Sequence, residues 1–154
     1  MQELIEKYKL VSHPEGGYYR ETYRSAQNVF SSVAKEDRNA ATHIYFLLTS
    51  GQISRFHKVL HDEIWNFYEG APLKLITYNC EIINECVISG KSDNYVSIIP
   101  AGAYQAAEST GDYSLVGCTV APGFDFKDLT FMSDDPAAVA KCRKNHPEFS
   151  KFIE

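Results

Sequence analysis

Nine short segments rich in Tyr, Val, Ile, Phe and Thr recur through the middle of the chain, and turn-forming residues separate them. These segments are residues 17–24, 42–48, 53–59, 64–69, 73–79, 81–88, 95–100, 104–109 and 113–120. A sheet of that size must close on itself or fold over, because large open sheets twist and expose unpaired edges. The pattern therefore predicts an all-β barrel or sandwich.

Helical signals are confined to the two ends of the chain. Residues 3–8 have apolar side chains on one helical face, and residues 134–145 offer Asp134 or Asp135 as an N-cap with Pro136 at the first helical position. We therefore expect a short helix at each end. The long polar connection at residues 26–41 is expected to be a mobile loop or lid.

Composition limits both the domain count and the partners. A chain of 154 residues with 44% hydrophobic residues is long enough for one core, so we expect one domain. A net charge of -5, without a block of Lys or Arg, argues against nucleic-acid binding. No apolar run approaches the roughly 18 residues of a membrane span, and no signal-peptide pattern is present, so the expected location is cytoplasmic.

The stretch from Gly51 to Gly70 concentrates the residue types that carry chemistry. If it forms a strand, a turn and a second strand, alternation places Arg55 and His57 on one face, and Glu63 lies opposite His57 across the hairpin. A histidine that faces a carboxylate supplies either two metal ligands or an oriented imidazole base. Both interpretations stay open at this point.

The spacing of His57 and Glu63 between two glycines resembles the first conserved motif of the cupin superfamily, and segment 100–105 resembles the second. The family usually has a second histidine in the first motif and another histidine in the second. This chain has Val59 and Gln105 at those positions. The resemblance therefore keeps two of the family's four metal ligands, His57 and Glu63.

Further motifs extend the resemblance to the cupin-5 branch, a domain of unknown function. They are HPEGGYYRETYRS, DEIWNFYEGAPL, IPAGAYQAAE and GCTVAPGFDF, within about residues 10–132. The resemblance implies one cupin domain over residues 1–154, a double-stranded β-helix or jelly-roll barrel with a C-terminal helical tail at 134–154. It also implies a homodimer in which residues 18–25 pair into the partner's sheet.

The resemblance leads to two hypotheses about the chemistry of the site. In the first, His57 and Glu63 hold a divalent metal weakly, with His61 and Gln105 as further ligands, in a metal-dependent isomerase or oxygenase. In the second, which follows the similar fold of dTDP-sugar epimerase-type cupins, Glu63 orients His57 as a metal-free proton acceptor. A tyrosine, Tyr45 or Tyr104, would then return a proton on the opposite face of the sugar.

Binding alone is also compatible with such a pocket. Arg20, Arg24 and Arg55 would contact phosphate oxygens of a nucleotide or nucleotide sugar, because a guanidinium matches two oxygens at once. Tyr18, Tyr19, Trp65 or Phe124 would stack against a base, although core packing and surface solvation also explain these residue types. We favour a protein that binds a nucleotide or nucleotide sugar with epimerase-like or isomerase-like activity. The ligand-binding residues predicted for it are Arg20, Tyr45, Arg55, Trp65, Gln105 and Phe124.

Overall fold

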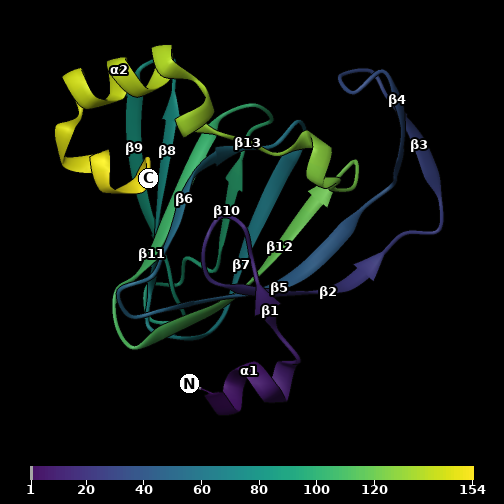
Figure 1. Ribbon diagram of the computed structural model, residues 1–154. Helices are drawn as coiled ribbons and strands as arrows, with labels where there is room; N and C mark the ends of the chain where they lie inside the picture. The colour runs from purple at the N-terminus through teal and green to yellow at the C-terminus, as the bar shows by residue number, and fades with distance from the viewer. Residues whose placement is uncertain (1) are drawn as a thin grey trace.

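The computed structural model describes residues 2–154, and two antiparallel sheets face each other around a shared interior (Figure 1). In spatial order, the first sheet contains β1 (Val11–Ser12), β2 (Tyr18–Arg24), β5 (Thr42–Thr49), β12 (Tyr113–Ala121), β7 (Asp62–Gly70) and β10 (Val96–Ile99). The second contains β13 (Thr130–Phe131), β6 (Ile53–Lys58), β11 (Tyr104–Ser109), β8 (Leu73–Asn79) and β9 (Ile82–Ile88). This arrangement confirms the predicted all-β double-stranded β-helix.

Each of the nine predicted segments overlaps one strand of these sheets, whereas sequence patterns missed β1, β13 and a separate hairpin. That hairpin consists of β3 (Asn28–Ser31) and β4 (Glu36–Asn39), and it extends away from the barrel (Figure 1). The expectation of a loop at residues 26–41 is therefore wrong, whereas the expectation of a mobile lid there stays a prediction. Strand β2 pairs with β5 of its own chain along one edge and with β1 only at Tyr18 and Tyr19 on the other, so the expected pairing of residues 18–25 with a partner's sheet stays a prediction.

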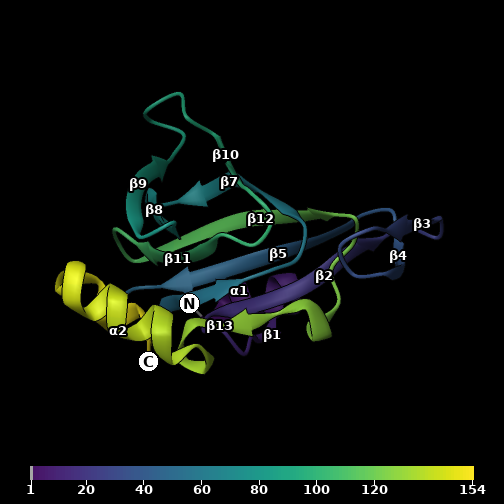
Figure 2. The same cartoon turned by 90° about the horizontal axis from the view of Figure 1, so that it is seen from above.

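Short helices lie at both ends, as predicted. Helix α1 (Gln2–Tyr8) precedes the barrel, and α2 (Pro136–Asn145) begins after Asp135, whose side chain accepts a hydrogen bond from the backbone N–H of Ala138 at 3.0 Å. Helix α2 and the 3₁₀ helix η3 (Pro147–Phe152) cover the outer face of the second sheet (Figure 2). The core between them includes Phe56, Ile76, Met132, Cys142, Phe149 and Phe152. Within residues 2–154, no helix has the length and apolarity that a membrane crossing requires.

The interior of the barrel changes character along single strands. On β5, Phe46 and Leu48 belong to the apolar core, whereas Thr42 lines a cavity farther along the same face. On β7, Trp65 is fully buried in that core and Glu63 lines the cavity. Inward-facing side chains recur every second residue along a strand. On both strands these side chains are apolar at one end, where they fill the barrel, and polar at the other end, where they line the cavity.

Candidate functional site

The cavity between the two sheets has a volume of about 290 Å3. The titratable residues that line it are His13, Glu15, Glu21, Arg24, His57, Glu63 and Cys118. Its apolar and hydroxyl-bearing lining consists of Tyr19, Thr42, Ile44, Val59, Val120, Phe124 and Phe126. A volume at the low end of the ligand-site range suits a small organic molecule.

A bulge in β6 determines which side chains enter this cavity. Gln105 pairs with His57 but Ala107 pairs with Ser54, so β6 has an extra residue between these two pairs. The simple alternation that placed Arg55 beside His57 is therefore wrong. Arg55 stacks on the ring of Phe131, 4.4 Å from its centroid, and does not line the cavity.

Glu15 is the site residue that sequence reasoning missed. Its Oε2 atom lies 3.0 Å from Nε2 of His57, and the hydroxyl of Ser54 donates to its Oε1 atom at 2.9 Å. Glu15 belongs to the loop between β1 and β2, and this loop packs closely against β6. The close approach needs Gly16, which has a φ of +110°, because a Cβ there would lie 2.1 Å from the carbonyl oxygen of Ile53. The adjacent glycines at 16 and 17 were the sequence signal for this close approach.

Gln105 connects His57 to Glu63, which lie on opposite sheets and not on one hairpin as expected. The indole N–H of Trp65 donates to Oε1 of Gln105 at 2.9 Å, which fixes the amide orientation because an indole can only donate. The amide nitrogen then lies 3.2 Å from Nε2 of His57 and donates to Glu63. Trp65 is thus a buried support for Gln105 and does not line the cavity.

The hydrogen bonds define the protonation of His57. Its Nδ1 atom lies 2.7 Å from the carbonyl oxygen of Arg55, which can only accept, so Nδ1 carries a proton. Burial lowers the pKa of His57, which favours the neutral ring with an unprotonated Nε2. Burial also raises the pKa of Glu15 to about 8. A protonated Glu15 that donates to Nε2 satisfies both groups.

Glu63 and His13 complete the electrostatics of the buried end. Burial, opposed by His57 and assisted by the nearby Glu15, raises the pKa of Glu63 to about 7. Burial lowers the pKa of His13 to about 4, and its Nδ1 atom accepts a hydrogen bond from the backbone N–H of Glu15 at 3.3 Å. The site therefore contains neutral imidazoles beside two carboxyl groups that titrate near neutral pH.

The predicted set of metal ligands does not come together. His61 lies 2.7 Å from the hydroxyl of Ser31 and does not line the cavity. Gln105 presents N–H groups, which cannot coordinate a cation, toward His57 and Glu63. Across residues 2–154, no group of three or more His, Cys, Asp or Glu residues is placed to hold a metal ion. The donor set does not fit the predicted metal, and the metal-dependent hypothesis receives no support from this geometry.

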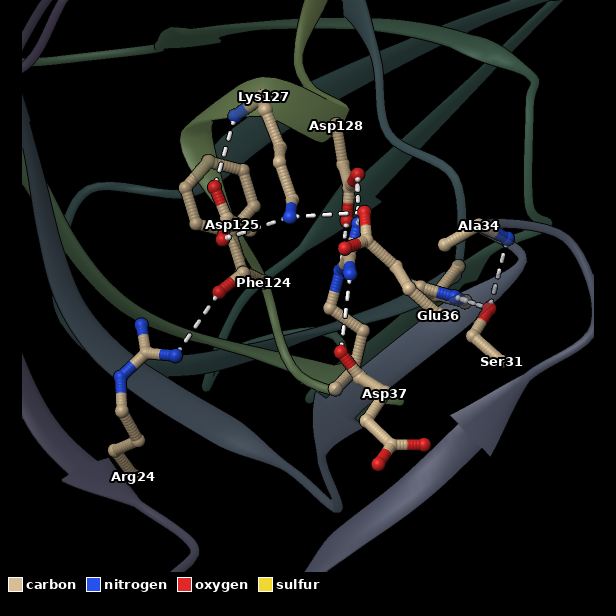
Figure 3. Close-up of polar contacts among 11 residues, drawn as sticks. Arg24, Ser31, Ala34, Glu36, Asp37, Phe124, Asp125, Lys127 and Asp128 are labelled. Carbon is tan, nitrogen blue, oxygen red and sulfur yellow. Dashed lines mark hydrogen bonds and ion pairs between the residues drawn. The ribbon is translucent and has the colours of Figure 1, made fainter.

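Aromatic side chains surround the cavity mouth, where Phe124 lies as one of the predicted ligand-binding residues. Its ring centroid is 5.0 Å from that of Phe126, which in turn is 6.2 Å from that of Tyr19. Arg24 also reaches the mouth and donates to the carbonyl oxygen of Phe124 at 3.2 Å (Figure 3). The sequence left open whether Arg24 contacts a ligand or is only a solvated surface residue, and the structure places it in the lining of the cavity.

Three other predicted residues lie outside the cavity. The guanidinium carbon of Arg20 is 5.4 Å from the ring centroid of Tyr45, and Tyr45 lines a separate surface groove with Tyr8, His43 and Tyr68. Tyr104 packs against the C-terminal helical region and donates to Asp135 at 3.1 Å. Neither predicted tyrosine can face a ligand beside His57, whereas Tyr19 lines the cavity.

The β3–β4 hairpin is fastened to the cavity mouth. Arg38 donates to both oxygens of Asp128, at 2.7 and 2.8 Å. Lys127 pairs with Glu36 at 2.8 Å (Figure 3). Asp128 and Lys127 belong to the 3₁₀ helix η1 (Phe126–Asp128), whose first residue is one of the aromatic residues of the mouth. The hairpin therefore supports the segment that carries Phe126.

Comparisons with known proteins agree with this fold. Residues 2–132 match the family described as Cupin superfamily (DUF985). Protein SO0799 from Shewanella oneidensis is 30% identical in a match that covers 99% of this chain and 96% of that chain, with a TM-score of 0.84. A hypothetical protein from Leishmania major is 28% identical over 99% of this chain and 95% of that chain, with a TM-score of 0.82.

A curated relative gives the same result. The uncharacterized protein YML079W of Saccharomyces cerevisiae is 28% identical over 155 residues, which cover 88% of this chain and 76% of that protein. The family match spans most of the chain and includes Glu15, His57 and Glu63, the residues at the buried end of the cavity. The chain therefore belongs to the Cupin superfamily (DUF985) family.

Proposed function

We propose that the chain binds a sugar-sized hydroxylated carbonyl compound in the barrel cavity and exchanges a proton with it, as an epimerase or isomerase does. The observation that carries the proposal is the 3.0 Å contact between Oε2 of Glu15 and Nε2 of His57 at the buried end of an aromatic-rimmed cavity. A pair of groups that shares one proton near neutral pH is suited to general acid–base chemistry. A nucleotide sugar would place its sugar inside and its nucleotide outside the mouth.

The proposed step runs through the form in which Glu15 has released the shared proton to solvent, so that the pair has an unoccupied proton-accepting site beside the neutral His57. The pair removes the proton from the carbon next to the carbonyl group, and the electron pair of the broken C–H bond moves onto the carbonyl oxygen as an enolate forms. In an isomerisation the pair returns the proton to the neighbouring carbon of an enediol, and in an epimerisation a second donor protonates the other face of the same carbon, a role for which the cavity lining offers the Tyr19 hydroxyl. Protons and electrons balance, and no further reactant is needed.

Exchange with deuterated solvent tests the proposal. Keto sugars and their nucleoside diphosphate conjugates are incubated with the protein in D2O, and deuterium at the carbon beside the carbonyl group is followed by NMR. We expect incorporation with the wild-type chain and a loss of about 100-fold or more in His57→Gln and Glu15→Gln, which is the usual range for a general base. His43→Gln, on the outer surface, is the matched control.

Two results would contradict the proposal. Equal incorporation by wild-type protein and His57→Gln would remove His57 from the chemistry. No binding of any of these compounds in a thermal-shift titration would remove the ligand class, because a ligand that binds the folded state raises its melting temperature.

We also propose that the chain forms a homodimer, as its resemblance to other cupins implies, and that the outer face of the first sheet contributes to the contact. Ile98 and Val96 on the edge strand β10 are 63% and 47% exposed, and Tyr68 on the neighbouring strand β7 is 44% exposed. Exposed apolar groups on a sheet edge are typical of an association surface. Light scattering after gel filtration should give a dimer mass, and Ile98→Asp should give a monomer.

A further inference from the structure

We propose that the part of the ligand inside the cavity is uncharged, and that Glu21 acts as a specificity determinant by occupying the guanidinium of Arg24. This inference rests on the proposed function, because it names the chemical class of the ligand for that same cavity. It assigns a role to a rim ion pair that takes no part in the Glu15–His57 chemistry.

The first observation is the imbalance of charged groups around the cavity. Among the described residues that line it, Arg24 is the single Arg or Lys side chain, whereas Glu15, Glu21 and Glu63 contribute carboxyl groups. A phosphate or carboxylate bound inside would lose its hydration and would lie near these acids. Only a free guanidinium at Arg24 would offset that cost.

The second observation is that Arg24 is already occupied. Its Nε and Nη2 atoms donate to the two carboxylate oxygens of Glu21 at 3.0 and 2.7 Å. Its Nη1 atom donates to Oδ1 of Asn39 at 2.8 Å and to the carbonyl oxygen of Phe124 at 3.2 Å. The Nε and Nη2 donors, which would otherwise bind two oxygens of an anion, are therefore already hydrogen-bonded to Glu21.

The third observation is that the backbone builds this pair into the strand. Glu21 pairs with Ile44 and Tyr23 pairs with His43, so β2 has a bulge at Thr22. The bulge lets Glu21 and Arg24, three residues apart, reach the same cavity, which regular alternation would forbid. The ion pair is thus a local feature of the strand and does not depend on a distant contact.

The remaining residues that line the cavity are suited to a ligand with uncharged polar groups. Glu15, His57 and Glu63 offer donors and acceptors at the buried end, and Tyr19, Phe124 and Phe126 offer apolar surfaces at the mouth. A sugar ring has hydroxyl groups at its edge and C–H groups on its faces, which matches both surfaces. A sugar phosphate adds a charge for which the wild-type cavity has no free partner.

Glu21→Gln tests the inference, because it removes the negative charge that is paired with the guanidinium while it keeps the shape of the side chain. Glu36→Gln is the matched control, since it removes an exposed carboxylate that pairs with Lys127 and Arg38 but does not line the cavity. Affinities for glucose, glucose 6-phosphate and inorganic phosphate are measured by calorimetry and ligand-observed NMR. The double variant Glu21→Gln/Arg24→Met shows whether any gain needs Arg24.

We expect Glu21→Gln to bind phosphate and glucose 6-phosphate at least about tenfold more tightly than the wild type, which corresponds to about 1.4 kcal/mol. Glu36→Gln and the double variant should show no such gain. Wild-type protein that binds glucose 6-phosphate as tightly as glucose, or Glu21→Gln without any gain for phosphate, would overturn the inference. Failure of glucose alone to bind would count against the sugar ligand of the proposed function, while the phosphate result would still decide the role of Glu21.

Discussion

Replacement of Glu15 by Gln should flatten the pH dependence of stability near neutral pH. Glu15 is buried, and burial raises its pKa in the folded protein from 4.5 to about 8. Between these values the folded chain holds a proton that the unfolded chain has released. The stabilising contribution is therefore complete below pH 4.5 and is lost as the pH rises through about 8.

The magnitude follows from this one-proton difference. One proton corresponds to a slope of at most about 1.4 kcal/mol per pH unit. Between pH 7 and pH 8 Glu15 contributes most of the slope, because His57 has a pKa lowered from 6.5 and Glu63, with a pKa of about 7, is already half ionised at pH 7; comparison with Glu15→Gln subtracts the remaining contribution of Glu63. In that window we expect the wild-type free energy of unfolding to fall by about 1 kcal/mol more than that of Glu15→Gln.

Urea unfolding at pH 7, 7.5 and 8 measures these free energies, provided that unfolding is reversible and two-state. Gln can donate to Nε2 of His57 as a protonated Glu15 does, so the variant should remain folded and lose little stability at pH 8. Parallel pH profiles, together with a loss of about 3–5 kcal/mol at each pH, would instead show that Glu15 and His57 form a buried ion pair and would refute the reasoning.

Three further predictions concern the supports of the site. Trp65→Phe removes the donor that fixes the amide of Gln105, so deuterium incorporation into the keto sugar should fall while the circular dichroism spectrum stays native. The free energy of unfolding should drop by about 1–3 kcal/mol. Gly16→Ala should lower the melting temperature far more than Gly51→Ala, because a Cβ at 16 meets backbone within 2.1 Å and one at 51 meets nothing within 4 Å; equal shifts would contradict this packing. Arg38→Met should increase hydrogen exchange at residues 28–39, and unchanged protection would show that the hairpin is held by other contacts.

Local patterns predicted the fold well, because each depends on neighbouring residues. The period-two segments gave the strands of both sheets, and Asp135 with Pro136 gave the start of α2. The β3–β4 hairpin escaped prediction because its strands are short and polar and are stabilised by Arg38 and Asp128, which are 90 residues apart. A contact over such a distance leaves no periodic signal in the sequence.

The candidate site was predicted only in part, for a related physical reason. His57, Glu63 and Gln105 were identified by motif spacing, and the structure does place them together. Regular alternation failed for Arg55 because a bulge shifts the faces of β6, and single-sequence periodicity does not reveal a bulge. Glu15 comes from a loop that joins β6 only in the folded chain, so no local pattern linked it to His57.

The protonation state of His57 offers the most direct test of the central claim, which is that the buried end of the barrel holds one exchangeable proton between Glu15 and a neutral imidazole. Nitrogen-15 NMR of histidine-labelled protein at pH 7 distinguishes a protonated ring nitrogen from a bare one. We predict a protonated Nδ1 and an unprotonated Nε2 for His57. Two protonated nitrogens, the signature of an imidazolium paired with an ionised Glu15, would contradict the account.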